Sequence, residues 1–364
     1  DCQQSLPVSD SFSDALLAWH DQHGRHDLPW QHPREPYRVW LSEIMLQQTQ
    51  VRTVIPYFQR FLHRFPKLPA LAEAPLDEVL AHWAGLGYYS RARNLHRCAQ
   101  LCVSQHGGTL PNDQALLEAL PGIGRSTAAA IRAQAYGEAS AILDGNVKRV
   151  LSRYHGIEQW PGLPAVTARL WELAERHTPR HRVADYTQAI MDLGAGVCRR
   201  SRPTCGDCPV TENCQARIQG RQADWPARAP RRNRPERHSF VLWALDRQGM
   251  SLFERRPPSG IWGGLWSLPE IPFEGEEPEP LSIARCWCAA RGIGLLDWMA
   301  LPRFRHDFTH FRLHLHPIRL RVAPGSVVAE SDQRWIAPGE LESVGLPRPI
   351  ERLFAGSAEI PPGG

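Results

Sequence analysis

Four cysteines near the middle of the chain constrain its fold more than any other feature. Cys198, Cys205, Cys208 and Cys214 fall within 17 residues, with six, two and five residues between them. Thiolates this close in sequence can surround only one small metal centre, and an iron–sulfur cluster takes four cysteine ligands. A zinc site is the alternative, but it usually uses two Cys-x-x-Cys pairs, and only Cys205 and Cys208 form one here. The spacing therefore favours an iron–sulfur cluster over zinc.

The composition is that of an ordinary globular protein. At 364 residues the chain exceeds what one hydrophobic core usually organises, so a multidomain protein is expected. Hydrophobic residues make up 42% of the chain, yet no apolar run could span a membrane, and the amino terminus has no signal-peptide pattern. These features predict a cytoplasmic protein without a membrane partner.

Positive charge is concentrated in one region, although the net charge is only +4. Residues 199–237 include ten arginines and four acidic residues. A basic tract beside a metal site is typical of a protein that binds a polyanion such as nucleic acid. A solvated, charged linker is the alternative, and it suits the portion after Gly220.

The spacing of apolar residues changes along the chain and predicts two domains. In 1–216 they recur at helical intervals, as in Val51, Ile55 and Phe58, so this part is predicted to be all-helical. Residues 217–237 are rich in Arg and Pro, which predicts an extended linker. In 238–364 the period becomes two, as expected for strands.

The second domain is predicted to be mixed α+β. Apolar and polar residues alternate around 240–244 and 311–315, and one helix is expected near 283–291. After Pro317 the apolar positions shift from odd to even numbers. Such a shift at a proline predicts a β-bulge or an edge position.

The segment 120–131, Leu-Pro-Gly-Ile-Gly-Arg-Ser-Thr-Ala-Ala-Ala-Ile, predicts a tight turn followed by a helix of small residues. Gly122 and Gly124 would let the backbone approach a phosphate closely, with amides of the helix start facing it. A Gly-x-Gly pair alone is more often a plain turn. The flanking residues make the segment resemble a helix-hairpin-helix element, which grips the DNA backbone without reading its sequence.

Two acidic residues lie where acid–base chemistry is plausible. Glu43 is surrounded in sequence by Leu41, Ile44 and Leu46, and burial there would raise its pKa and keep a proton available. An exposed position on an amphipathic helix is the alternative. Asp144 follows an apolar run and precedes a predicted helix, so it is either a plain N-cap or a reactive carboxylate.

Taken together, these segments resemble the helix-hairpin-helix superfamily of DNA base-excision glycosylases. Ser42-Glu-Ile-Met-Leu-Gln-Gln-Thr49 and Gly85-Leu-Gly-Tyr-Tyr-Ser-Arg-Ala-Arg93 are similar to one branch, the MutY adenine DNA glycosylases. The resemblance covers nearly the whole chain. It implies a monomeric base-excision-repair enzyme with a 4Fe-4S cluster. This enzyme would remove adenine mispaired with 8-oxoguanine or guanine from double-stranded DNA, associating with the bacterial nucleoid when it binds.

The resemblance also implies roles in the reaction. Adenine inside a duplex is out of reach, so it must first be extruded. Glu43 would then protonate adenine at N7, and Asp144 would stabilise the positive charge left on the sugar. Asn146 would orient either Asp144 or the attacking water. The residues implied to hold the adenine are Trp30, Leu46 and Gln188.

Ser126 separates two kinds of related enzyme. Bifunctional members such as endonuclease III have a lysine there, which forms an imine and also breaks the strand. Ser126 predicts a monofunctional glycosylase, and a tyrosine stands there in other MutY members, so the resemblance assigns its hydroxyl no certain role. The rival predictions are a bifunctional pyrimidine-lesion glycosylase with lyase activity and a non-catalytic iron–sulfur protein that binds DNA or senses redox state.

Further residues are implied to contact DNA. Gln48 and Tyr88 would occupy the base stack, with Tyr88 beside the oxidised guanine. The other implied DNA contacts are Leu86, Arg91, Gly122, Gly124 and Lys148.

The segment 238–364 resembles the MutT-like (Nudix-like) module that reads 8-oxoguanine in this family. The resemblance rests on Gly260-Ile-Trp-Gly-Gly-Leu-Trp-Ser-Leu-Pro269 and His306-Asp-Phe-Thr-His-Phe311. No Glu-rich hydrolase motif is present, so the module is expected to bind without hydrolysing nucleotides. Phe308, Thr309 and His310 match the reading loop, and the Thr309 hydroxyl could accept from the N7 hydrogen or donate to O8 of the lesion. A structural turn is the alternative.

Overall fold

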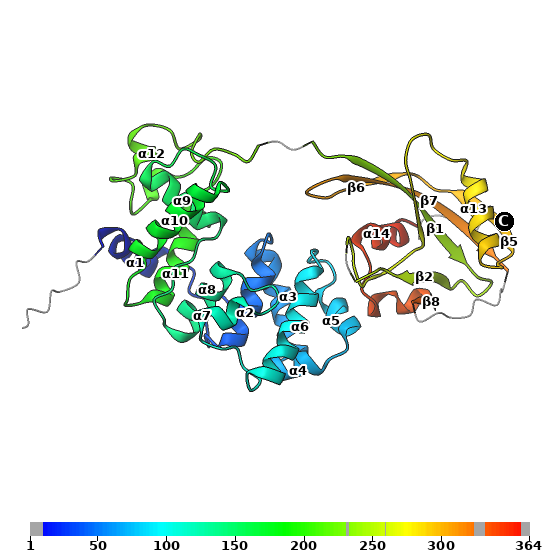
Figure 1. Ribbon diagram of the computed structural model, residues 1–364, viewed down its shortest axis with the longest axis horizontal. Coiled ribbons are helices and arrows are strands. Elements are labelled where there is room, and N and C mark those ends of the chain that lie inside the picture. The colour runs from blue at the N-terminus through cyan, green and yellow to red at the C-terminus, as the bar shows by residue number, and fades with distance from the viewer. Residues whose placement is uncertain (1–9, 231–232, 259, 324–331, 358–364) are drawn as a thin grey trace, which may run out of the picture. The chain divides into compact units, whose positions relative to one another are not determined.

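The computed structural model describes residues 10–230, 233–258, 260–323 and 332–357 (Figure 1). The chain separates into two compact units. Unit 1 comprises residues 1–73 and 94–230, and unit 2 comprises residues 74–93 and 231–364. Within the described ranges, no helix is both long and apolar enough to cross a membrane.

Unit 1 is built from helices, as the apolar spacing predicts. Its elements are α1 (Ser11–His23), α2 (Pro36–Leu46), α3 (Val51–Arg64), α4 (Leu68–Glu73), most of α6 (Ser90–Gln105), α7 (Gln114–Glu118), α8 (Arg125–Tyr136), α9 (Gly145–His155), α10 (Pro164–His177), α11 (Val183–Asp192), the π-helix η1 (Leu193–Val197), the 3-10 helix η2 (Cys205–Asp207) and α12 (Gln215–Ile218).

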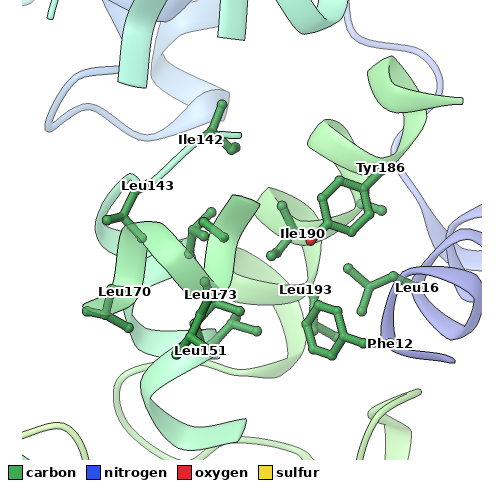
Figure 2. Packing of buried hydrophobic residues seen from close by; sticks show 14 of the residues in the cluster. Phe12, Leu16, Ile142, Leu143, Leu151, Leu170, Leu173, Tyr186, Ile190 and Leu193 are labelled. Atoms are coloured by element: carbon green, nitrogen blue, oxygen red, sulfur yellow. The ribbon is translucent and has the colours of Figure 1, made fainter. Parts of the chain in front are cut away.

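One hydrophobic core of unit 1 joins α1, α9, α10 and α11. Figure 2 shows Phe12 and Leu16 of α1 close to Leu193, the first residue of η1 after α11. Leu143, in the segment before α9, belongs to the same core, and each fully buried Leu or Phe contributes about 2 kcal/mol to stability. This packing holds the start of α9, where Asp144 is the N-cap residue.

Unit 2 combines one mixed sheet with helices. Its elements are α5 (Leu76–Trp83), β1 (Glu236–Leu245), β2 (Ser251–Arg255), β3 (Trp266–Ser267), β4 (Glu270–Phe273), α13 (Pro280–Ala290), β5 (Leu295–Ala300), β6 (Phe304–Asp307), β7 (Arg312–Val322), β8 (Gln333–Ile336), the 3-10 helix η3 (Pro338–Ser343) and α14 (Arg348–Ser357).

The sheet runs β3-β2-β1-β7-β5, with β4 paired to β1, β6 to β7 and β8 to β2. Strands β1 and β7 are parallel in unbroken register from Glu236↔Arg312 to Leu245↔Arg321, and the other pairs are antiparallel. Helix α13 packs on this sheet and confirms the helix predicted near 283–291. The predicted fold class, a helical domain with an α+β domain, is confirmed.

Pro317 lies neither at a bulge nor on an edge strand, so that prediction is wrong. On one side β7 pairs with β1 without a shift. On the other side it pairs with β6 up to Leu315 and with β5 from Ile318 onward. On that second side the Pro317 carbonyl accepts a hydrogen bond from the Leu301 backbone N–H. Pro317, which has no N–H to donate, lies at the position where β7 changes its pairing partner from β6 to β5.

The predicted linker is only partly extended. Helix α12 reaches Ile218 and β1 begins at Glu236. Between them Trp225 is only 3% exposed, and its carbonyl accepts a hydrogen bond from Arg153 at 2.9 Å. The first part of this segment is therefore packed onto unit 1.

Candidate active site

A cavity of about 970 Å³ in unit 1 brings together most of the residues implied in the chemistry. It lies among α2, α3, α8, α9 and α11, which come from three separate stretches of the chain. The predicted residues that line it are Trp30, Glu43, Leu46, Gln48, Ser126, Asp144, Asn146 and Gln188.

Glu43 projects into this cavity from α2, which begins at Pro36 and buries Leu41, Ile44 and Met45. Burial, reinforced by the negative charge of Asp144, raises the pKa of Glu43 to about 7. The predicted pKa shift is therefore confirmed, and the alternative of an exposed Glu43 is wrong. A carboxyl group with this pKa is protonated in about half of the molecules at neutral pH.

Asp144 is the N-cap of α9 and also lines the cavity. The two interpretations of its sequence context, an N-cap and a reactive carboxylate, are therefore compatible. Its Oδ1 accepts from the backbone N–H of Val147 at 2.8 Å, and its Oδ2 accepts from the Asn146 amide at 3.3 Å. Burial raises the pKa of Asp144 above its ordinary value, while these donors oppose the rise. These donors favour the ionised form of Asp144. Glu43 has fewer hydrogen-bond donors around it, so its ionised form is less stabilised.

Arg149 connects the Asp144 region to the first cysteine. Its Nε donates to the Cys198 carbonyl at 2.8 Å, and its Nη2 donates to Asn146 Oδ1 at 2.8 Å and to the Gly194 carbonyl at 2.7 Å. Since Asn146 donates to Asp144, hydrogen bonds run continuously from Cys198 to the carboxylate. The amide of Asn146 is oriented at both ends.

Ser126 lies in the first turn of α8. Its Oγ accepts a hydrogen bond from the Leu143 backbone N–H at 3.0 Å. The hydroxyl therefore supports the segment that leads into Asp144. A serine has no amine with which to form an imine.

Gln188 is only 3% exposed, and a hydrogen bond orients its side chain. Its amide nitrogen donates to Asp192 Oδ1 at 2.7 Å. The same carboxylate accepts from the backbone N–H and the guanidinium of Arg25. Trp30, at another wall of the cavity, packs edge-to-face on Phe58 with ring centroids 5.4 Å apart. These contacts orient polar and aromatic groups around the space where a base would fit.

The four cysteines line one small cavity together with Arg153 and Arg217. None of the four forms a disulfide bond. Burial raises the pKa of Cys208 to about 12, so four thiolates could coexist here only beside a centre that supplies positive charge. Among the described residues no three His, Cys, Asp or Glu converge closely enough for a single ion. Four cysteines around one small cavity are the donor set that an iron–sulfur cluster takes.

The hairpin predicted at 120–131 is present as α7, a turn and α8. Gly122 has φ +81°, a conformation that favours glycine, and an added Cβ would lie 3.0 Å from the Asn94 side chain. Gly124 is the N-cap of α8, where a Cβ would meet open space. Lys148 is half-buried on α9. DNA contacts at these residues stay predictions.

Gln48 and Tyr88, the residues implied in the base stack, share an unusual backbone. Their φ angles are 58° and 50°, in the left-handed region that non-glycine residues rarely occupy. The Tyr88 side chain is 47% exposed. Strained, exposed residues of this kind often have functional roles.

The loop that carries Tyr88 is held by Arg91. The Arg91 side chain, from a residue only 8% exposed, donates to the carbonyls of Leu86 at 3.3 Å and Gly87 at 3.2 Å. Leu86 is itself buried. The structure therefore shows Arg91 and Leu86 supporting the loop, and their implied contact with DNA stays a prediction.

A second cavity, of about 460 Å³, lies in unit 2. Tyr88, Trp262, Phe308, Thr309 and His310 are among the residues that line it. The ring of Phe308 stacks on Phe311 at 4.5 Å and lies 5.3 Å from that of Trp262. Thr309 is exposed at the tip of the loop. Aromatic packing thus fixes the loop, while the hydroxyl of Thr309 stays accessible.

The comparisons with known proteins agree with this geometry. A model described as HhH-GPD superfamily base excision DNA repair protein matches residues 41–176, and a NUDIX domain model matches 240–356. Adenine DNA glycosylase from Buchnera aphidicola subsp. Acyrthosiphon pisum (strain APS) is 35% identical over 345 residues, 94% of this chain and 96% of the relative. The chain belongs to the adenine DNA glycosylase family. Mouse adenine DNA glycosylase is 34% identical over 94% of this chain and 77% of its own.

Among solved structures, a thermostable thymine-DNA glycosylase matches with a TM-score of 0.53 at 29% identity. The match covers 57% of this chain and 95% of that structure. The sequence prediction of an adenine DNA glycosylase family member is therefore confirmed, and membership places the chain among base-excision-repair glycosylases.

Sequence reasoning missed several residues around the cavity of unit 1. Arg25, Arg149 and Asp192 orient predicted site residues through the hydrogen bonds described above. Gln134 of α8 was missed as well, although a signal for it exists. It is a polar residue within an otherwise apolar buried face, Ala128–Ala130, Ile131 and Ala133. Nothing comparable in the sequence marks Arg149.

Proposed function

We propose that the protein is a monofunctional DNA glycosylase that hydrolyses the N-glycosidic bond of adenine paired with 8-oxoguanine or guanine. The observation that supports this most directly is the pairing of Glu43 with Asp144 in one cavity. Two carboxyl groups with different hydrogen-bond donors around them can take different roles, one as the proton donor and the other as the stabilising anion. The enzyme acts as a monomer on double-stranded DNA, in the compartment that contains the DNA.

The first step is departure of the base. An extruded adenine would enter the cavity of unit 1, which is large enough for a nucleobase. Gln188, fixed by Asp192, would contact the base edge, and Trp30 would pack against it. Glu43, protonated near neutral pH, gives its proton to N7, so that the C–N bond breaks to release a neutral base.

The second step stabilises and captures the sugar. Loss of adenine leaves positive charge on the deoxyribose, and the ionised Asp144 faces it from the start of α9. A fixed carboxylate is effective because it needs little reorganisation as the charge develops. Water then adds to the anomeric carbon, and its proton passes to a carboxylate of the site. Because Ser126 supplies no amine, the strand is left intact.

The lesion partner would be read in unit 2. Thr309 offers a hydroxyl that both donates and accepts, which suits O8 and the N7 hydrogen of 8-oxoguanine. Tyr88, which lies on the loop that Arg91 supports, would stack among the bases of the DNA duplex. Helix α13 carries no carboxylate, so the NUDIX-like unit would bind the oxidised base without hydrolysing a nucleotide.

The four cysteines would hold one 4Fe-4S cluster, which shapes the arginine-bearing segment 199–202 for contact with phosphates. Purified protein should contain about four irons per chain with matching acid-labile sulfide. Cys208→Ser should lose most of both, because the described lining of the cavity holds no further Cys, His, Asp or Glu side chain that could replace it. Cys286→Ser, an exposed thiol on α13, is the control and should keep them. Stoichiometric zinc in place of iron would contradict the assignment.

The proposed activity is tested with duplexes that carry adenine opposite 8-oxoguanine, guanine or thymine. Cleavage of the adenine strand is expected only after alkali, with single-turnover rates fastest opposite 8-oxoguanine. Cleavage without alkali would indicate a lyase and favour the bifunctional alternative. Absence of adenine release in all three duplexes, with DNA binding retained, would leave a binding or sensing role.

A further inference from the structure

We infer that Gln134 is a positioning residue for the catalytic acid. The inference rests on the proposed role of Glu43 in adenine release. Gln134 comes from α8 and donates its side-chain amide to Glu43 Oε1 at 3.1 Å, across 91 positions of sequence. It is 5% exposed and does not line the cavity, so it cannot touch the base itself.

The composition of α8 makes this contact specific. The other buried residues of the helix are four alanines and Ile131, so Gln134 is the polar member of that face. An amide buried in such surroundings is unfavourable unless it is hydrogen-bonded. Glu43 provides the acceptor, and the two helices that carry the pair pack directly on each other.

The hydrogen bond has two consequences for Glu43. An amide N–H can only donate, so Oε1 must act as the acceptor and the acidic proton is left on Oε2. Gln134 also favours the ionised form, so the hydrogen bond lowers a pKa that burial and Asp144 raise. Gln134 thus selects the oxygen that carries the proton and keeps the acid strong enough to give it up.

Gln134→Met removes the donor while nearly preserving side-chain volume. The pH at which single-turnover adenine release falls on the alkaline side should rise by about half a unit to one unit, because the pKa of Glu43 rises. The rate on the acidic plateau should fall several-fold because the carboxyl group is no longer oriented. In a Glu43→Gln background the same substitution should leave the residual rate unchanged. A uniform loss of rate with an unmoved alkaline limb would indicate a merely structural role.

A second readout does not depend on activity. A hydrogen bond to a carboxylate is stronger than one to a neutral acid, so the difference in Tm between the wild-type protein and Gln134→Met should increase as pH rises through about 7. Glu43→Gln should abolish this pH dependence. If adenine release failed while the pH-dependent Tm difference appeared, the proposed reaction would be wrong and the Gln134–Glu43 coupling would stand. A pH-independent Tm difference would overturn the coupling.

Discussion

Glu43→Gln should lower the single-turnover rate of adenine release by roughly two to four powers of ten at pH 6, the usual contribution of a positioned proton donor. Glutamine preserves the shape of the side chain and can still accept from Gln134, but it has no acidic proton. DNA binding should persist because the cavity walls are unchanged. Glu35→Gln is the matched control, since Glu35 precedes the same helix, is exposed and has no capping hydrogen bond. It should react at the wild-type rate.

The pH dependence follows from the same residue. The acid must be protonated, so the wild-type rate should fall about tenfold per pH unit above the Glu43 pKa of about 7. The Glu43→Gln protein should lack this alkaline limb. A wild-type rate that stayed constant from pH 6 to 9 would show that another group donates the proton.

Protein stability separates loss of chemistry from loss of fold. The pKa of Glu43 is higher in the folded protein than in the unfolded chain, so its ionisation disfavours folding as pH rises toward and through about 7. Glu43→Gln removes this effect and should give a Tm at pH 8 at least as high as the wild type. A strongly lowered Tm would mean that the carboxyl group supports the fold.

Local features explain what could be predicted from the sequence. The cysteine spacing within 198–214, the hairpin at 120–131 and the apolar neighbours of Glu43 all lie in short segments whose physical chemistry is visible in the residue order. The rise in the Glu43 pKa follows because the residues around it in α2 are apolar and buried. Asp144 was ambiguous for the same local reason, since an N-cap and a reactive carboxylate have the same sequence context.

Contacts between distant segments explain what could not be predicted. Nothing in the residues around Arg149 indicates that it bonds to Gly194 and Cys198, which are 45 and 49 positions away. The prediction for Pro317 was wrong because the alternation of apolar and polar residues within one strand does not show which other strands pair with each part of it. The carbonyl of Trp225, in the linker, accepts a hydrogen bond from Arg153, more than 70 positions earlier in the chain. These features depend on tertiary packing, which overrides local pattern.

Gly194 is the residue at which such packing has the largest predicted consequence. It lies in the π-helix that follows α11, a local form that is frequent at functional sites. A Cβ added there would lie 2.5 Å from Asn146 Cβ and 3.2 Å from Asn146 Cα. Those atoms belong to the start of α9 and are not the end of a flexible side chain. Asn146 must therefore move, and with it the hydrogen bonds to Asp144 and Arg149.

Gly194→Ala should lower the single-turnover rate of adenine release by about a hundredfold, the loss expected when a reacting group is misplaced by about 1 Å. Overpacking of this kind also costs about 1–3 kcal/mol of unfolding free energy, so the Tm should fall by several degrees. Gly196→Ala is the matched control in the same π-helix, since its added Cβ would meet nothing within 4 Å, and it should keep the wild-type rate and Tm. Equal rates for the two variants would mean that the position of Asn146 does not control Asp144. A loss confined to Gly194→Ala, with DNA binding intact, would tie the reactivity of Asp144 to the packing of α9 on the segment that leads to Cys198.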